Sequence, residues 1–188
     1  MPDFVFPFPG KELAHTELSY DSCYERIPEA DRTEIVDLAW NRGSETANTV
    51  WAESSGETDF FAIADKNGLR YRREDRDYVL GGRRYFSEYL SGTNTVTLYT
   101  QSVSLWAEQN GISREAAENL IMSHEFFHFL ECTKLGLTSK LYLVPMVTIG
   151  PLKIGRTGIR ALSEIGAHAF SRTYYDLAGG KPGSDNKK

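Results

Sequence analysis

Cysteine is scarce in this chain, and long apolar runs and a basic N-terminal segment are lacking. Its 188 residues include two cysteines, Cys23 and Cys132, which excludes a disulfide framework and predicts reduced thiols. The longest apolar stretch, residues 141–149, includes Pro145 and is too short to cross a bilayer, so we expect no membrane partner. The apolar N-terminus is interrupted by prolines, which does not fit a signal peptide. Together these features predict a cytoplasmic protein.

Positive charge is not in excess either. The net charge is −5 at pH 7, so bulk electrostatics does not favour a nucleic-acid partner. Six arginines lie between Arg70 and Arg84, but three acids are interspersed among them. This pattern is more typical of a solvated hairpin face than of a patch for nucleic acid or acidic peptide. With 40% hydrophobic residues and 25% charged residues, the chain is expected to form one globular domain with a real core.

The most informative stretch is an H-E-x-x-H motif formed by His124, Glu125 and His128. Residues four apart on a helix lie nearly one above the other, so the two imidazoles can offer nitrogens to one metal ion. Zn²⁺ prefers such nitrogens, and Glu125 is placed to accept a proton from a water on the metal. The motif therefore predicts metal-dependent hydrolysis with Zn²⁺ as the cofactor. The alternative is a chance register of these side chains on an ordinary core helix.

The helix that carries the motif is predicted to begin after a Ser113 cap and to end before Gly136. Apolar residues occur on every side of it, which predicts burial on every side. Buried histidines and a buried glutamate need partners, and a metal ion would satisfy them together. Cys132 lies one turn beyond His128 and is interpreted as a buried thiol; a fourth, inhibitory ligand is the alternative.

A third ligand is expected from the last predicted helix, residues 159–177. Glu164 and His168 lie four apart on one face of it, and the small residues Gly166 and Ala167 would let two helices approach a shared metal. Glu164 is the predicted ligand, and the alternative is an exposed helix carboxylate. His168 could support a ligand, bind the metal or hydrogen-bond the substrate carbonyl. It could also be a core histidine satisfied by a backbone carbonyl.

Here the sequence resembles the gluzincin branch of the zincin metallopeptidases, in which a helix downstream of H-E-x-x-H supplies a glutamate ligand. It is more closely similar to small bacterial and phage-associated peptidases of the ImmA/IrrE type, whose E-x-x-A-N-x-F-A pattern parallels residues 164–171. The resemblance covers residues 94–178. The sequence departs from it at His168, where gluzincins commonly have an acid or an amide.

This resemblance implies a zinc metallopeptidase that acts on a peptide or protein substrate. The implied metal ligands are His124, His128 and Glu164. Glu125 would be the general base, and His168 would act on the substrate carbonyl, alone or with a tyrosine such as Tyr174 or Tyr175. A second function class is a non-catalytic, zinc-stabilised binding or regulatory module on the same fold. A structural zinc site closes its fourth position and has no use for a base, so Glu125 favours the enzyme.

The expected fold is α+β and zincin-like, with a small, mostly antiparallel sheet packed on the buried active-site helix and a C-terminal ligand helix. It would form a single domain over residues 1–178. Its first part, residues 1–12, is expected to be an extended arm whose phenylalanines pack on the domain. Residues 179–188 are expected to be a disordered tail.

The expected elements upstream of the motif begin with a helix after Pro28, with Gly43-Ser44 as a candidate break. Residues 60–64 are predicted to be a strand, joined by a tight turn at Asn67-Gly68 to a partner strand at 69–72. A second hairpin is expected around Gly81-Gly82.

Closer to the motif, residues 94–100 are predicted to be the edge strand on which an extended substrate would pair. A short helix is expected at 102–109. Residues 137–158 show no strong period and are expected to be a connection.

Overall fold

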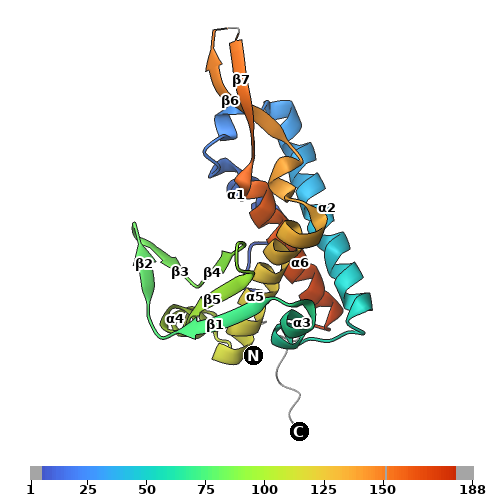
Figure 1. Ribbon diagram of the computed structural model, residues 1–188, viewed down its shortest axis with the longest axis vertical. Helices are drawn as coiled ribbons and strands as arrows, with labels where there is room; N and C mark the ends of the chain where they lie inside the picture. Colours follow the sequence, from blue (N-terminus) through green and yellow to red (C-terminus); the bar gives the residue numbers. More distant parts are fainter. Residues whose placement is uncertain (1–5, 151, 181–188) are drawn as a thin grey trace.

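The computed structural model describes residues 6–150 and 152–180 and has an α+β architecture of helices and three small sheets. Helix α6 (Arg160–Leu177) lies at the centre and packs against both α2 (Glu29–Glu53) and α5 (Arg114–Leu130), as Figure 1 shows. A two-stranded hairpin stands at one end of the molecule, and the other strands lie toward the opposite end. The expected α+β class and the two C-terminal helices are therefore confirmed.

The remaining elements are short. The helical ones are η1 (Lys11–Leu13), α1 (Ala14–Ser19), η2 (Tyr24–Arg26), α3 (Phe60–Asn67), α4 (Thr100–Asn110), the π-helical turn η3 (Glu131–Leu135) and η4 (Thr138–Lys140). The strands are β1 (Arg70–Glu74), β2 (Tyr78–Leu80), β3 (Arg83–Tyr85), β4 (Ser87–Leu90), β5 (Thr95–Tyr99), β6 (Leu143–Ile149) and β7 (Leu152–Gly158).

The main sheet has the order β1-β5-β4, with β5 parallel to β1 and antiparallel to β4. The strand predicted at 94–100 is present as β5, but its predicted place at the sheet edge is wrong. Val96 and Leu98 on β5 are fully buried, as expected for a central strand that neighbours cover on both sides. The edge strands of this sheet are β1 and β4, and the sequence pattern did not reveal β4. All other strand pairs in the described chain are antiparallel.

The strand predicted at 60–64 is wrong, because this segment is helix α3. The carboxylate of Asp59 accepts the Phe61 N–H and caps the helix. Phe60 and Ile63 are buried one turn apart, which is helical spacing. Gly68, with φ of 77°, ends the helix in the left-handed conformation instead of turning a hairpin. The chain then enters β1, so a strand exists near the predicted 69–72, with a different partner.

Helix α2 runs without the break considered at Gly43-Ser44. The glycine serves close packing instead: a Cβ on Gly43 would lie 2.0 Å from the carbonyl oxygen of Gly166 on α6. The two helices touch backbone to backbone at this point. Gly166 also faces Phe127 of α5, whose ring would lie 2.9 Å from an added Cβ. Small residues therefore set the spacing of all three central helices, as the sequence predicted for α5 and α6.

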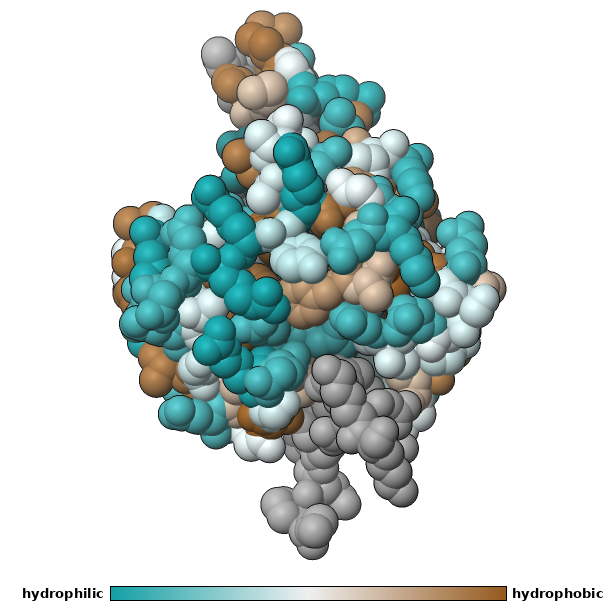
Figure 2. Space-filling view, turned by 60° about the horizontal axis from the view of Figure 1, so that its bottom comes forward, coloured by the Kyte–Doolittle hydropathy of each residue, from teal (hydrophilic) through white to brown (hydrophobic). Residues whose placement is uncertain are grey.

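Residues 137–158 are not an irregular connection, because they form η4 and the antiparallel β6–β7 hairpin. Exposed apolar side chains on this hairpin (Met146, Leu152 and Ile154) obscured any simple period. They form an apolar group at the top of Figure 2, on an otherwise mainly hydrophilic face. The hairpin predicted around Gly81-Gly82 is confirmed as β2–β3, and the helix predicted at 102–109 is confirmed as α4.

The predicted N-terminal arm, residues 1–12, is described from residue 6 on, and its last two residues belong to η1. Residues 6–10 precede η1 without regular structure, and Phe6 and Phe8 pack onto the domain. Residues 1–5 of the predicted arm and 181–188 of the predicted tail lie outside the described residues. Within the described chain, no helix is both long enough and apolar enough to span a bilayer.

Candidate metal centre

Helix α5 brings the two histidines of the motif to one point. The hydroxyl of Ser113 accepts the Ala116 N–H and caps the helix, as predicted. Regular α-helix then continues through Leu130, so His124 and His128 stand one above the other. Their Nε2 atoms lie 3.2 Å apart. Two facing imidazole nitrogens at this distance share one binding point.

Glu164 on α6 completes a triangle with the two histidines. Its Oε2 lies 3.2 Å from Nε2 of His124, and its Oε1 lies 3.6 Å from Nε2 of His128. Zinc bonds of about 2.0–2.1 Å in a tetrahedral site place neighbouring ligand atoms roughly 3.3–3.4 Å apart. The three observed separations are close to this value, with the two from Glu164 measured to its two different oxygens.

The charge state of Glu164 also suits a cation. Burial by itself raises the pKa of this carboxyl, but hydrogen bonds with His124 and His128 outweigh burial and hold the pKa well below its ordinary value. The group is therefore an ionised carboxylate at neutral pH. An anionic oxygen beside two imidazole nitrogens is a donor set that zinc prefers. Glu164 is placed where the sequence predicted it.

A buried carboxylate that the sequence did not single out fixes His128. Nδ1–H of His128 donates to Oε2 of Glu131 at 2.9 Å. The side chain of Glu131 is 2% exposed, and its Oε1 accepts from the Thr138 N–H at 2.7 Å and from the Ser163 hydroxyl at 2.9 Å. A hydrogen bond at Nδ1 directs Nε2 toward His124 and Glu164, where it would bind a metal in exchange for its proton. The signal in the sequence was the i+3 spacing of Glu131 after the second histidine.

The pKa values of this pair follow from the same contact. Burial alone lowers the pKa of His128, but its hydrogen bonds with Glu131 and Glu164 outweigh burial and raise the pKa well above its ordinary value. Burial alone raises the pKa of Glu131, and the bond from His128 outweighs it and lowers the pKa. Glu131 is therefore an ionised acceptor beneath the metal ligand.

Cys132 is exposed, so the prediction of a buried thiol is wrong. It lies in the π-helical turn Glu131–Leu135, where the α-helical spacing that would carry residue i+4 to the face of His128 no longer holds. Cys132 lines a cavity beside His128, but the metal-sized group found among the described residues does not include it.

Glu125 points toward the sheet rather than into the bulk of the core. It is 8% exposed, and its Oε1 accepts from the hydroxyl of Ser87 at 2.5 Å. Ser87 is the first residue of the edge strand β4. This hydrogen bond therefore links the predicted general base, Glu125, to strand β4. Ser87 lies 38 residues away in the sequence, and no motif marked it.

His168 lies in the site, where the sequence predicted it. It can offer a nitrogen that lies, with ligand atoms of His124 and Glu164, in a group whose members are all within 4.8 Å of one another. Burial, and then the nearby His124, lower its pKa to about 3. A neutral imidazole can bind a metal through one nitrogen or donate a hydrogen bond from the other. Two overlapping groups of candidate ligands thus share His124 and Glu164. The group with His168 has all its ligand atoms within 4.8 Å of one another, and the group with His128 is joined by contacts of 3.2 Å and 3.6 Å.

The tyrosines considered for the carbonyl lie elsewhere. The hydroxyl of Tyr174 donates to the Glu57 carbonyl oxygen at 2.6 Å and lies 2.9 Å from the hydroxyl of Ser54. Tyr174 is buried in the aromatic core, and Tyr175 packs against Phe6 with ring centres 4.8 Å apart. Neither residue lines the two cavities at the metal centre, so this expectation is wrong.

Two cavities meet at the metal centre, and both are lined by His124, Glu125 and Glu164. One holds about 370 Å³ and extends beneath the N-terminal arm; the other holds about 540 Å³ and extends past His128 toward Cys132. The predicted metal therefore lies at the junction of two openings, where an extended ligand can pass on either side.

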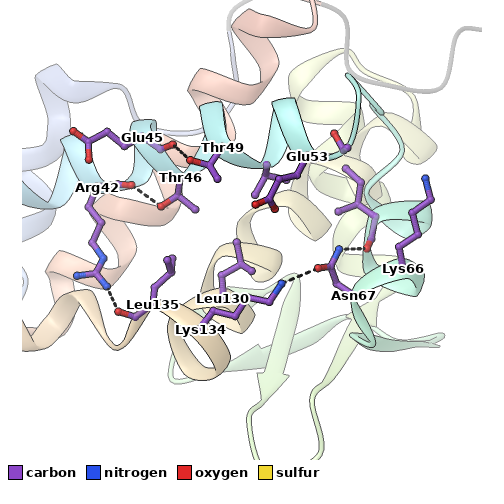
Figure 3. Close-up of a pocket in the computed structure, with 13 residues that line it drawn as sticks. Arg42, Glu45, Thr46, Thr49, Glu53, Lys66, Asn67, Leu130, Lys134 and Leu135 are labelled. Carbon is purple, nitrogen blue, oxygen red and sulfur yellow. Dashed lines mark hydrogen bonds between the residues drawn. The ribbon is translucent and has the colours of Figure 1, made fainter.

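A larger cavity of about 570 Å³ lies between α2, α3 and the end of α5 (Figure 3). Arg42 at its rim donates to the Leu135 carbonyl oxygen, and Lys134 donates to Oδ1 of Asn67 at 3.1 Å. Its lining, among the described residues, includes none of the predicted site residues. This cavity is distinct from the metal centre.

No family model, curated protein or solved structure matches this chain. The case for a metal centre accordingly rests on the residues themselves. Helices α5 and α6 bring His124, Glu164 and His168 close enough to hold one metal ion, and Nε2 of His128 lies 3.2 Å from that of His124.

Proposed function

We propose that this protein is a zinc-dependent metallopeptidase that hydrolyses peptide bonds, with a zincin-like arrangement of its active site. The observation that carries the proposal is the triangle of His124, His128 and Glu164, with the carboxylate of Glu125 lining the same two cavities. Bound zinc supplies a water of pKa about 7 and polarises the scissile carbonyl.

The proton is handled by Glu125. Its Oε1 is held by Ser87, which leaves Oε2 to accept the proton of the attacking water. The same oxygen then passes that proton to the leaving amine nitrogen. His168, in the cavity beside Glu125, donates an N–H hydrogen bond to the carbonyl oxygen as negative charge develops there.

The substrate backbone is proposed to pair with β4. This strand pairs with β5 along one edge, and no described strand pairs with its other edge. An extended peptide can add to such an edge through main-chain hydrogen bonds. Because Ser87 at the start of β4 bonds Glu125, a peptide on this edge would bring its scissile bond close to the base.

The cavities favour the enzyme over a non-catalytic zinc module. A structural site closes its fourth position with a protein ligand. Here the metal triangle opens into cavities on two sides, and a carboxylate that does not belong to the triangle lines both. That geometry leaves room for water and for a substrate.

The test compares zinc-loaded wild type with Glu125→Gln on a peptide library read by mass spectrometry. Glutamine keeps the shape and the bond to Ser87 but cannot accept a proton, so zinc content should stay at one per chain and cleavage should fall by several orders of magnitude. A His124→Ala/His128→Ala protein should lose the zinc. Equal cleavage by Glu125→Gln contradicts the mechanism, and stoichiometric zinc in the double variant contradicts the site. Zinc without cleavage by the wild type favours the module.

A further inference from the structure

The N-terminal arm reaches the metal centre. Phe6 is buried against Tyr175, and the guanidinium carbon of Arg172 lies 5.2 Å from its ring centre. Two residues later, the ring of Phe8 lies 5.5 Å from that of His124 and is stacked on His168 at 5.8 Å. The arm is thus anchored at Phe6 and delivers Phe8 to the site.

Phe8 forms part of an apolar wall. Its ring centre lies 5.5 Å from that of Trp106, and the ring centre of Phe86 lies 5.4 Å from that of the same residue. Together with Ile121, these rings line the 370 Å³ cavity. Displacing water from such an apolar wall costs little free energy, and contact of the rings with an apolar group of a ligand stabilises binding.

The second cavity has a different chemistry. It is lined by Glu88, Glu131 and Arg160, which do not line the first cavity, and its aromatic residues are Tyr85 and Tyr89. The cluster of Phe8, Phe86 and Trp106 lines the first cavity alone. An extended peptide that passes through both would therefore meet the more apolar wall in the first cavity.

We propose that Phe8 is a specificity-determining residue, and that the subsite it closes with Phe86 and Trp106 takes a bulky apolar side chain next to the scissile bond. This inference rests on the proposed function. A negatively charged side chain is disfavoured in the subsite because Glu125 and Glu164 line the same cavity, and the charge of Arg84, which also lines it, is paired with Asp77. The N-terminal arm is in this way a part of the substrate-binding site.

The experiment measures the binding of three hydroxamates to the zinc-loaded protein by calorimetry. Acetohydroxamate carries a methyl group, phenylacetohydroxamate a benzyl group and malonohydroxamate a carboxymethyl group. All three present the same chelating head to zinc, so differences among them report the subsite. We expect the benzyl compound to bind at least about tenfold more tightly than the methyl one, and the carboxymethyl one to bind most weakly.

Phe8→Ala should remove most of the benzyl preference, measured as the ratio of the affinities for phenylacetohydroxamate and acetohydroxamate. Phe61→Ala is the matched control, since Phe61 is also a partly buried phenylalanine but packs edge to face against Tyr71, outside this cavity. It should keep the preference. An intact preference in Phe8→Ala, tighter binding of all three compounds in that variant, or no preference in wild type overturns the inference while the zinc site stands. If no hydroxamate binds wild type, the proposed function fails together with the inference.

Discussion

Oε2 of Glu131 lies 2.9 Å from Nδ1 of His128, on the far side of that imidazole from Glu164. A carboxylate in this position fixes the tautomer of a metal-binding histidine and makes its other nitrogen a better donor. Since Thr138 and Ser163 hold the second oxygen of Glu131, the carboxylate cannot turn away. The metal site is therefore supported by the segment that follows α5 and by α6.

Glu131→Gln should weaken zinc binding by about 10- to 100-fold, because the amide is a poorer acceptor for Nδ1–H and carries no charge. Competition with a chelator of known affinity measures this. The control is Glu118→Gln, another buried carboxylate of α5, which pairs with Arg73 and Arg114. It should lower stability and leave zinc affinity as it is. Equal losses of zinc affinity in both variants would show that the loss comes from changing any buried carboxylate near the end or start of α5, and not from the contact with His128.

Zinc should stabilise the folded chain by linkage, because the triangle of donors exists only when α5 and α6 are packed. At free zinc of 100 times Kd the gain is about 2.7 kcal/mol in the free energy of unfolding. Thermal unfolding with zinc and with a chelator measures it. His128→Ala should show no zinc-dependent rise in Tm, and a rise equal to that of wild type would place the metal elsewhere.

Gly43→Ala should destabilise the fold by about 1–3 kcal/mol or more, because its Cβ would lie 2.0 Å from the Gly166 carbonyl oxygen and would push α2 from α6. Gly92→Ala is the matched control, since an added Cβ there meets no atom of the described residues within 4 Å. It should change stability by less than about 0.5 kcal/mol. Urea unfolding compares the two, and equal stability would contradict the close approach.

The part of the site on α5 and α6 could be predicted because local spacing determines it. His124 and His128 share a face through helix geometry alone, and Glu164 stands among small residues that permit close helix packing. The helix predicted from Ser113 is present with its cap. In such cases the residues that determine where a side chain lies belong to a single helix.

Several of the misses depend on contacts across long sequence separations. Residues 60–64 are rich in strand-forming residues. The Phe60 N–H nevertheless donates a hydrogen bond to Oδ1 of Asn119 at 2.8 Å, and the segment packs on α5 as a helix. Ser87 meets Glu125, and Phe8 meets His124, only after the sheet and the arm are in place. The hydrophobic periodicity of those segments gives no indication of such distant partners.

Ser87→Ala should lower kcat by roughly tenfold and leave zinc content and affinity unchanged, because the lost hydrogen bond orients Glu125 without touching the metal. Ser87→Thr keeps the hydroxyl on a strand that tolerates β-branched residues, and it should restore most of the activity. Steady-state kinetics on a peptide cleaved by wild type provides the measurement. A loss that Thr does not restore would indicate a packing effect on β4.

His168→Gln distinguishes the roles open to the fourth polar group of the site. If His168 donates to the carbonyl oxygen, the variant should retain one zinc per chain and lose kcat by about 10²–10³-fold, the usual cost of one oxyanion donor. KM should change little, because that bond strengthens only as charge develops on the oxygen. His15→Gln, at the exposed histidine of α1, is the control and should behave as wild type. Metal analysis and kinetics on the same samples separate the outcomes. Loss of zinc from His168→Gln would make His168 a ligand, as its common reach with His124 and Glu164 allows.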